Sequence, residues 1–209
     1  MKLPSLRKAV VGSCRDLCEN GLMCNLGAGG NVSVRDAGSG LIALTPSQFR
    51  YDAMAAEDIV VVSENGDVVE ASEGRVPTSE LQTHTRIYKL YAGVNAIVHT
   101  HAPVSSALAS VMDEIPALTY ELLYLVGRSV PVIPFTMPGT SEMAESVAEA
   151  LRTTCALIIR NHGMFVTGET LDEAVVRAVS VEDAARLYHI ARTIGTPQLL
   201  PADVEKPRH

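Results

Sequence analysis

Apolar residues recur along the chain with two different spacings, which predict its helices and strands. Between residues 5 and 20 they fall three and four positions apart, as on one face of a helix, at Val10, Val11, Cys14, Leu17 and Cys18. Elsewhere they alternate with polar residues or form short unbroken runs, as in strands. The pattern predicts helices at 5–20, 79–91, 103–111, 141–152 and 170–194, and strands at 31–35, 41–44, 59–63, 67–70, 96–99, 130–135 and 156–167.

Turn and capping residues lie between these segments and indicate how they connect. Glu64-Asn65-Gly66 separates two short strands as in a hairpin, and Thr170-Leu171-Asp172-Glu173 has the pattern of a capping box. Helices alternate with strands, yet several strands are placed to pair as hairpins. This mixture predicts a three-layer α/β/α fold with a mixed or mainly antiparallel central sheet. Because no repeat or long linker interrupts it, we expect a single domain over residues 1–209.

Composition narrows the class of protein. The chain has 209 residues, of which 47% are hydrophobic and 20% charged, as in an ordinary globular protein. It carries 17 Lys and Arg against 24 Asp and Glu, a formal net charge of −7. Nucleic acid is not expected as a partner, because neutralising phosphates needs a basic surface. An anionic small molecule remains possible, since one pocket can be locally positive.

The chain shows no targeting or membrane signal, so we expect a cytoplasmic protein. Its first apolar stretch is too short for a signal peptide, and no run approaches the roughly 20 apolar residues of a membrane span. The four cysteines lack zinc-knuckle spacing. Cys14 and Cys18 share a helix face, where a metal pair is conceivable, but buried thiols in a reducing compartment are the favoured interpretation.

Histidines at the ends of apolar strands give the strongest chemical signal. His99 and His101 are two residues apart, so on a strand both imidazoles point to the same side and can converge on one ion. His162 ends another apolar strand, and Gly163 would let the backbone turn sharply beside it. Three histidines with an open fourth position are the usual ligands of catalytic zinc, although each alone could simply hydrogen-bond locally. His84 could support such a site or only fill a helix face.

Polar residues at the start of the predicted helix 79–91 could complete the site. Glu80 lies in its first turn, where a carboxylate can bind a metal, act as a general base or simply stabilise the helix dipole. Thr78 and Ser79, with the free backbone amides there, could form an anion pocket, and the glycine-rich run 27–31 could add further amides. The sequence contains neither a P-loop, a dinucleotide fingerprint nor a nucleophile elbow.

Five short motifs occur in an order that resembles one family. They are Gly30-Asn31-Val32-Ser33, Leu44-Thr45-Pro46-Ser47, Pro77-Thr78-Ser79-Glu80, Val98-His99-Thr100-His101 and Arg160-Asn161-His162-Gly163. Their order is similar to that of class II aldolases, above all those that cleave fuculose 1-phosphate, within the aldolase, epimerase and adducin-head superfamily. The likeness extends from about residue 5 to about residue 193.

The resemblance implies an α/β/α fold, a homotetramer with active sites between subunits, and one zinc ion per chain bound by His99, His101 and His162. Glu80 would be a fourth ligand at rest that leaves the metal to move a proton. Tyr120 would reach a neighbouring subunit's site and protonate the aldehyde side. The residues that would hold the substrate phosphate are Gly30, Asn31, Ser47, Thr78 and Ser79.

The reaction implied is the reversible cleavage of a ketose 1-phosphate into dihydroxyacetone phosphate and an aldehyde. Its chemistry suits these residues, because a Lewis-acidic metal can stabilise the charge that develops beside the ketone, and a carboxylate and a phenol can move the protons. Other reactions on the same fold stay open, namely those of a sugar-phosphate 4-epimerase, which usually has Asp in place of Glu80, a dehydratase or a decarboxylase. A non-catalytic adducin-like scaffold would be expected to lack the metal ligands.

Overall fold

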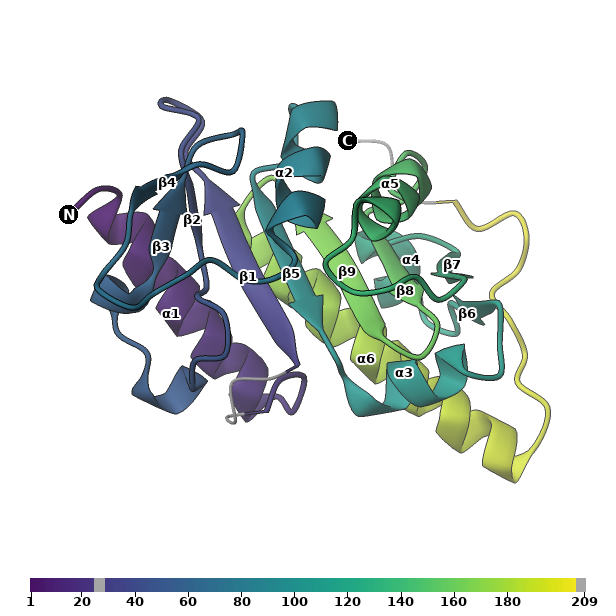
Figure 1. The fold of residues 1–209 in the computed structure, drawn as a ribbon. Helices are drawn as coiled ribbons and strands as arrows, with labels where there is room; N and C mark the ends of the chain where they lie inside the picture. The colour runs from purple at the N-terminus through teal and green to yellow at the C-terminus, as the bar shows by residue number, and fades with distance from the viewer. Residues whose placement is uncertain (25–28, 206–209) are drawn as a thin grey trace.

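Helices cover both faces of a central sheet, as the hydrophobic pattern predicts (Figure 1). The computed structural model describes residues 1–24 and 29–205. Within these residues the strands form one sheet in the order β4-β3-β2-β1-β5-β9-β8-β7-β6. Every neighbouring pair is antiparallel except β7 with β8. The strands are β1 Gly30–Arg35, β2 Ile42–Leu44, β3 Val60–Val62, β4 Val68–Glu70, β5 Ala96–Thr100, β6 Glu114–Pro116, β7 Ser129–Ile133, β8 Ala156–Ile159 and β9 Gly163–Gly168.

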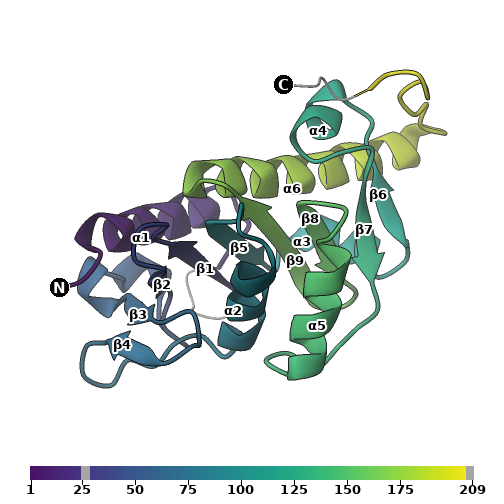
Figure 2. The same ribbon diagram turned by 90° about the horizontal axis from the view of Figure 1, so that it is seen from above.

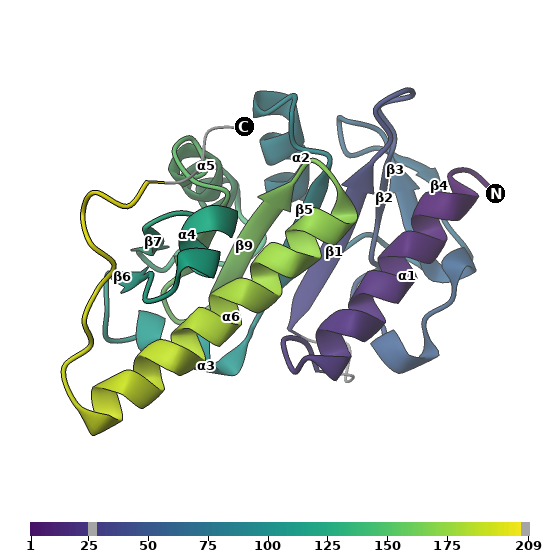
Figure 3. The same ribbon diagram turned by 180° about the vertical axis from the view of Figure 1, so that it is seen from behind.

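The described helices divide between the two faces. α1 (Pro4–Glu19), α4 (Tyr120–Leu125) and α6 (Leu171–Ile194) lie on one face, and α2 (Leu81–Leu90) and α5 (Ser141–Ala150) on the other (Figures 2 and 3). α3 (Pro103–Ala109) packs against α6, and two short 3-10 turns, Tyr51–Ala53 and Ala56–Asp58, lie between β2 and β3. The three-layer α/β/α fold with a mainly antiparallel sheet is therefore confirmed.

Alternating side chains on the strands form a separate apolar core on each face. On β5, for example, Val98 packs with α1 and α6 residues, whereas Ile97 packs with those of α2 and α5. On α1, Cys14 is fully buried and burial raises the pKa of its thiol, while Cys18 is half-buried. Cys14 therefore agrees with the expected buried thiol. Among the described residues, no helix is long and apolar enough to cross a lipid bilayer.

Two parts of the predicted element pattern were wrong. Segment 156–167 is not one strand but the hairpin of β8 and β9, because the chain reverses at Asn161, whose backbone is left-handed with φ 57°. β6 and α4 were missed, since three and six residues are too few to show a period.

At the start of α6 the Thr170 side chain accepts from the Glu173 amide as expected, but the Glu173 carboxylate accepts from the amide of Glu169 instead of Thr170.

α6 carries a buried carboxylate that caps α3. The Glu182 side chain is fully buried, and its two oxygens accept hydrogen bonds from the backbone N–H groups of Val104 and Ser105, each at 2.9 Å. These amides belong to the first turn of α3, where no helical carbonyl is available to accept from them. Because α3 begins two residues after His101, this contact fixes the loop that carries the histidine.

We expect Glu182→Ala to lower the free energy of unfolding by about 2–4 kcal/mol, because two buried N–H groups lose their acceptors. Urea denaturation measures the loss. Asp183→Ala, which removes an exposed carboxylate from the same helix, should change stability by no more than about 0.5 kcal/mol. Glu182→Gln keeps one acceptor oxygen and should fall between the two. Equal stabilities for the Glu182→Ala and Asp183→Ala variants would show that the cap contributes little.

Candidate metal and substrate site

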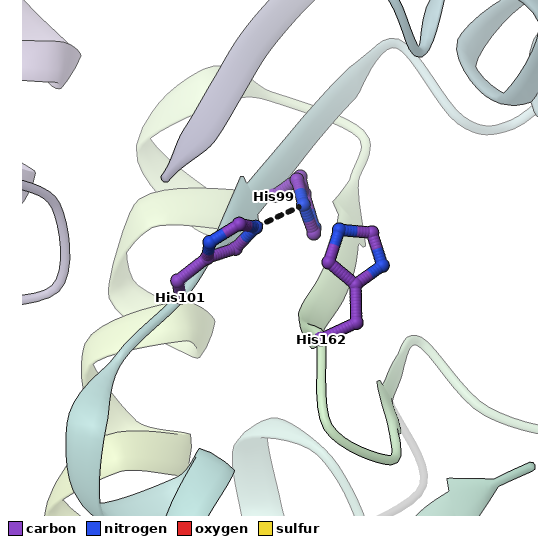
Figure 4. A group of neighbouring side chains, drawn as sticks. All are labelled: His99, His101 and His162. Carbon is purple, nitrogen blue, oxygen red and sulfur yellow. Dashed lines mark hydrogen bonds between the residues drawn. The ribbon is translucent and has the colours of Figure 1, made fainter. Parts of the chain in front are cut away.

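Strand pairing brings the first two histidines beside the third. His99 on β5 pairs with Phe165 on β9, and the two rings stack with centroids 4.1 Å apart. The Nδ1 of His99 lies 2.8 Å from the Met164 carbonyl oxygen, which leaves its Nε2 directed at the Nε2 of His101, 3.1 Å away. Figure 4 shows the ring of His162 converging on the same point. The predicted convergence of His99 and His101 is therefore present.

His162 reaches the site because it lies in the turn between β8 and β9. Gly163 follows it, and a Cβ there would stand 2.4 Å from the Thr100 carbonyl oxygen and 2.7 Å from the His101 ring. Since real atoms do not approach so closely, any larger residue would push β9 away from β5. Gly163 is therefore required by close packing against the strand that carries His99, and not by a sharp turn as the sequence suggested.

The carboxylate of Glu80, the residue that precedes α2, lies among the imidazoles. Its Oε2 is 3.2 Å from the Nε2 of His99, and its Oε1 is 3.2 Å from the Nε2 of His162. Burial alone would raise the pKa of Glu80, but His99, His162 and a hydrogen bond from Asn31 together hold it well below its usual range. Burial lowers the pKa of His99 to about 3. The site thus presents an ionised carboxylate beside the neutral imidazole of His99.

This donor set fits a divalent metal ion. The ligand atoms of His99, His101 and His162 all lie within 4.8 Å of one another. Nitrogen atoms at the corners of a tetrahedral zinc site would be about 3.3 Å apart, close to the 3.1 Å between His99 and His101. Metal ligands must also be deprotonated, as the lowered pKa values of His99, His101 and Glu80 favour. The three histidines could therefore bind a metal ion.

Two loops meet above this donor set and enclose a cavity of about 320 Å³. Pro46 and Pro77 form an isolated antiparallel bridge, and the Ser47 amide donates to the Val76 carbonyl at 2.9 Å. The cavity is lined by the three histidines and by Glu80. It is also lined by all the residues expected to hold a phosphate, which are Gly30, Asn31, Ser47, Thr78 and Ser79. None of the described residues lining it is Lys or Arg. An anion there would meet hydroxyls, amides and the N-terminus of α2.

Other predicted residues lie elsewhere, and some lining residues were not predicted. Tyr120 begins α4, is 49% exposed and is not among the residues that line the cavity. Gly27 and Ala28 of the glycine-rich run lie outside the described residues. Sequence reasoning missed Tyr51, whose hydroxyl donates to the Gly30 carbonyl at 2.5 Å, as well as the lining residue Pro138. No periodic or motif signal marks Tyr51 or Pro138.

The chain also matches known proteins over almost its whole length. Residues 8–189 match the family model described as the Class II Aldolase and Adducin N-terminal domain. The chain belongs to the class II aldolase and adducin family. A 5-deoxy-D-ribulose 1-phosphate aldolase of Bacillus thuringiensis serovar kurstaki is 33% identical over 203 residues, which cover 97% of this chain and 93% of the relative.

Two further comparisons place this class II aldolase among enzymes with different named substrates. A 5-methylthioribulose-1-phosphate/5-deoxyribulose-1-phosphate aldolase of Rhodospirillum rubrum is 36% identical over 199 residues, covering 95% of this chain and 87% of the relative. The solved structure of an L-fuculose 1-phosphate aldolase superposes with a TM-score of 0.88 at 31% identity, covering 95% of this chain and 92% of that one. These relatives are all aldolases, and therefore lyases, that act on sugar phosphates.

Proposed function

We propose that this class II aldolase binds Zn²⁺ through His99, His101 and His162 and cleaves a ketose 1-phosphate reversibly into dihydroxyacetone phosphate and an aldehyde. The main support is the position of the Glu80 carboxylate, 3.2 Å from two of the three imidazoles in a cavity that also holds an uncharged anion pocket. An ionised carboxylate beside three histidines supplies both a fourth metal ligand and a proton acceptor.

Each group has a distinct task in this reaction. Bound Zn²⁺ would supply a Lewis acid that stabilises the negative charge beside the ketone. In the cleavage direction the Tyr120 phenolate of a neighbouring subunit takes the proton of the C4 hydroxyl, the C3–C4 bond breaks with its electron pair moving to C3, and protonated Glu80 gives its proton to C3. In the reverse direction Glu80 takes the proton from C3, and Tyr120 of a neighbouring subunit protonates the aldehyde oxygen. Proton exchange with solvent then returns Glu80 and Tyr120 to their starting protonation states, so protons and charges balance in both directions.

The substrate phosphate would lie against the loops at Gly30, Asn31, Ser47, Thr78 and Ser79. Gly30 has φ 140°, and a Cβ there would stand 2.5 Å from the His99 carbonyl oxygen, so this loop runs directly against the ligand-bearing strand. One small substrate can therefore reach both sites, with its phosphate at this loop and its reacting carbons beside the histidines and Glu80. Without Lys or Arg among the described lining residues, the phosphate would be bound by backbone and hydroxyl dipoles.

Release of dihydroxyacetone phosphate from a substrate panel tests this function. The zinc-loaded protein is given L-fuculose, L-rhamnulose, 5-deoxyribulose and 5-methylthioribulose 1-phosphates, and the product is followed by a coupled reductase. We expect release from at least one of them, abolished by a chelator and restored by Zn²⁺. Silence on all four with zinc bound would contradict the proposal and direct the search to 4-epimerase, dehydratase and decarboxylase reactions.

We also propose that the active site is shared between subunits of a homotetramer, because Tyr120 lies outside its own chain's cavity. Its side chain is exposed, and Tyr124 on the same helix is also partly exposed at 38%. Exposed aromatic side chains are typical of surfaces that another chain covers. A neighbouring copy could then receive the Tyr120 hydroxyl in its own cavity.

Co-expressing two inactive variants tests the sharing. Tyr120→Phe and Glu80→Gln should each lose activity alone, yet a 1:1 mixture should recover about one quarter of the wild-type rate, because a quarter of the shared sites then combine one intact Glu80 with one intact Tyr120. Turnover of the purified mixed oligomer measures this recovery. No recovery in oligomers shown to contain both variants would assign the two residues to the same chain or remove Tyr120 from the mechanism.

A further inference from the structure

A row of buried polar side chains connects α2 to β1 behind the proposed metal site. Along and just before α2, Glu80, His84 and Tyr88 recur every four residues and so share one helix face. On β1, Asn31 and Ser33 are two residues apart and point to the same side. All five side chains are at most 5% exposed. Polar groups buried to this extent need defined hydrogen-bond partners.

Their hydrogen bonds form one chain that ends on Glu80. The Tyr88 hydroxyl is 2.7 Å from Ser33 Oγ, and Ser33 Oγ is 2.6 Å from His84 Nδ1. On the other side of the ring, His84 Nε2 is 2.5 Å from Asn31 Oδ1. The Asn31 amide nitrogen then donates to Glu80 Oε2 at 2.8 Å.

Only one arrangement of protons satisfies every member of this chain. Because Glu80 is an acceptor, the amide nitrogen of Asn31 must face it, and the amide oxygen must face His84. That oxygen requires the N–H of His84 Nε2, so Nδ1 is the acceptor and takes the proton of Ser33, whose oxygen accepts from Tyr88. Burial lowers the pKa of His84 to about 4, which agrees with a neutral ring.

We infer that His84 is a positioning residue that, through the side-chain amide of Asn31, holds the Glu80 carboxylate in its reactive orientation. The inference rests on the proposed function, because only in that reaction does Glu80 transfer a proton and need a fixed orientation. Without the His84 N–H, the Asn31 amide loses the partner that fixes its direction. A flipped amide would present its oxygen to the carboxylate and repel it. The His84 side chain reaches the Glu80 carboxylate in this chain only through the Asn31 amide.

His84→Phe keeps a planar ring of similar size and removes both hydrogen bonds. We expect it to lower kcat for dihydroxyacetone phosphate release by about 10- to 100-fold, as is usual for residues that orient a metal-site ligand. KM for the ketose 1-phosphate should change less than kcat, since Asn31 alone among the residues proposed to hold the phosphate is disturbed. His84→Gln can place an amide N–H near the position of Nε2 and should restore most of the rate. Zinc content should stay at one ion per chain in both variants.

The matched control is Ile87→Val in the same helix. Ile87 is fully buried and lies outside the hydrogen-bond chain, so its variant destabilises α2 by about 0.5–1.5 kcal/mol without touching Asn31. It should leave kcat within about twofold of the wild type. A rate loss in this control equal to that of His84→Phe would overturn the inference, because it would show that any weakening of α2 is sufficient.

A double-mutant cycle tests whether His84 acts through Asn31. In the Asn31→Ala background, His84→Phe should lower kcat by no more than about a further twofold, because the intermediate group is already missing. Full additivity of the two losses would exclude this route. If His84→Phe does not fold, His84→Leu, which also removes both hydrogen bonds, takes its place in the cycle.

A spectroscopic measurement separates the inference from the proposed function. In protein with 15N-labelled histidine, the His84 ring should be fixed in the Nε2–H form at neutral pH, with its signals identified through the His84→Gln variant. An Nδ1–H or charged ring would overturn the hydrogen-bond chain whatever the reaction. A wild-type protein that is silent on the whole substrate panel would overturn the proposed function, and the ring's tautomer would still decide the structural part of the inference.

Discussion

Replacing Glu80 with Gln is expected to lower kcat for ketose 1-phosphate cleavage by about 10²- to 10⁴-fold while one zinc ion per chain is retained. Gln keeps nearly the same size and can still accept the hydrogen bond from Asn31, but it cannot take up or return a proton. The three imidazoles remain to hold the metal. Steady-state kinetics and metal analysis of the same preparation measure both quantities. KM should change much less than kcat, because phosphate binding is separate from proton transfer.

Glu145→Gln serves as the matched control for this change. Glu145 lies on α5 with an exposed side chain that contacts Arg86, so the same substitution there should leave turnover and zinc unchanged. Glu80→Asp offers a second comparison, because it keeps the charge and shortens the side chain. A Glu80→Gln enzyme with wild-type kcat and zinc content would falsify the assignment of Glu80 as the proton-transferring group.

Loss of metal and activity together is the expected result of His101→Ala. Removing one of three imidazole ligands should weaken zinc binding by at least about 100-fold. The loss of a residue that only orients a ligand costs about 10- to 100-fold in metal affinity, so the loss of a ligand itself should cost more. The fold should be kept, because His101 is exposed whereas His99 on β5 is buried. Competition with a chromophoric chelator measures the affinity, and dihydroxyacetone phosphate release measures the activity.

His189→Ala is the matched control, because it also removes a histidine but at a position away from the cavity. His189 is exposed on α6 and should be replaced without effect on zinc affinity or rate. An enzyme with His101→Ala that remained fully active without metal would rule out a role for zinc in the reaction. Retention of zinc with loss of activity would instead assign His101 to the substrate and leave the metal to other ligands.

Local pattern was sufficient to predict much of the fold and the three histidines. The His-x-His spacing works because strand geometry directs both side chains to one side, whatever the rest of the chain does. The β8–β9 hairpin was missed because apolar residues flank Arg160-Asn161-His162 on both sides, and a period of two does not show where a strand reverses. Asn161 was the available signal, since Asn adopts left-handed backbone more readily than most residues.

Contacts between distant segments could not be predicted from spacing. Asn31 and Glu80 are 49 positions apart, and sequence alone gave Asn31 a place in the phosphate loop, whereas its amide also reaches the carboxylate. His84 was left undecided for the same reason, because its partners lie on β1. Tyr51 gave no signal at all, as its contact with Gly30 depends on how the turn after β2 packs.

The Glu182 cap on α3 has a consequence for the order of events as the chain is made. Its carboxylate meets the amide of Val104, 78 positions earlier, so the loop after His101 gains its last support only after most of the polypeptide has been synthesised. Long-range closures of this kind come late in folding, since the intervening chain must first be ordered. A ligand that binds only the finished site favours the state in which α6 is docked. Under the proposed zinc binding, the metal content of a preparation would also measure how many molecules have completed their folding.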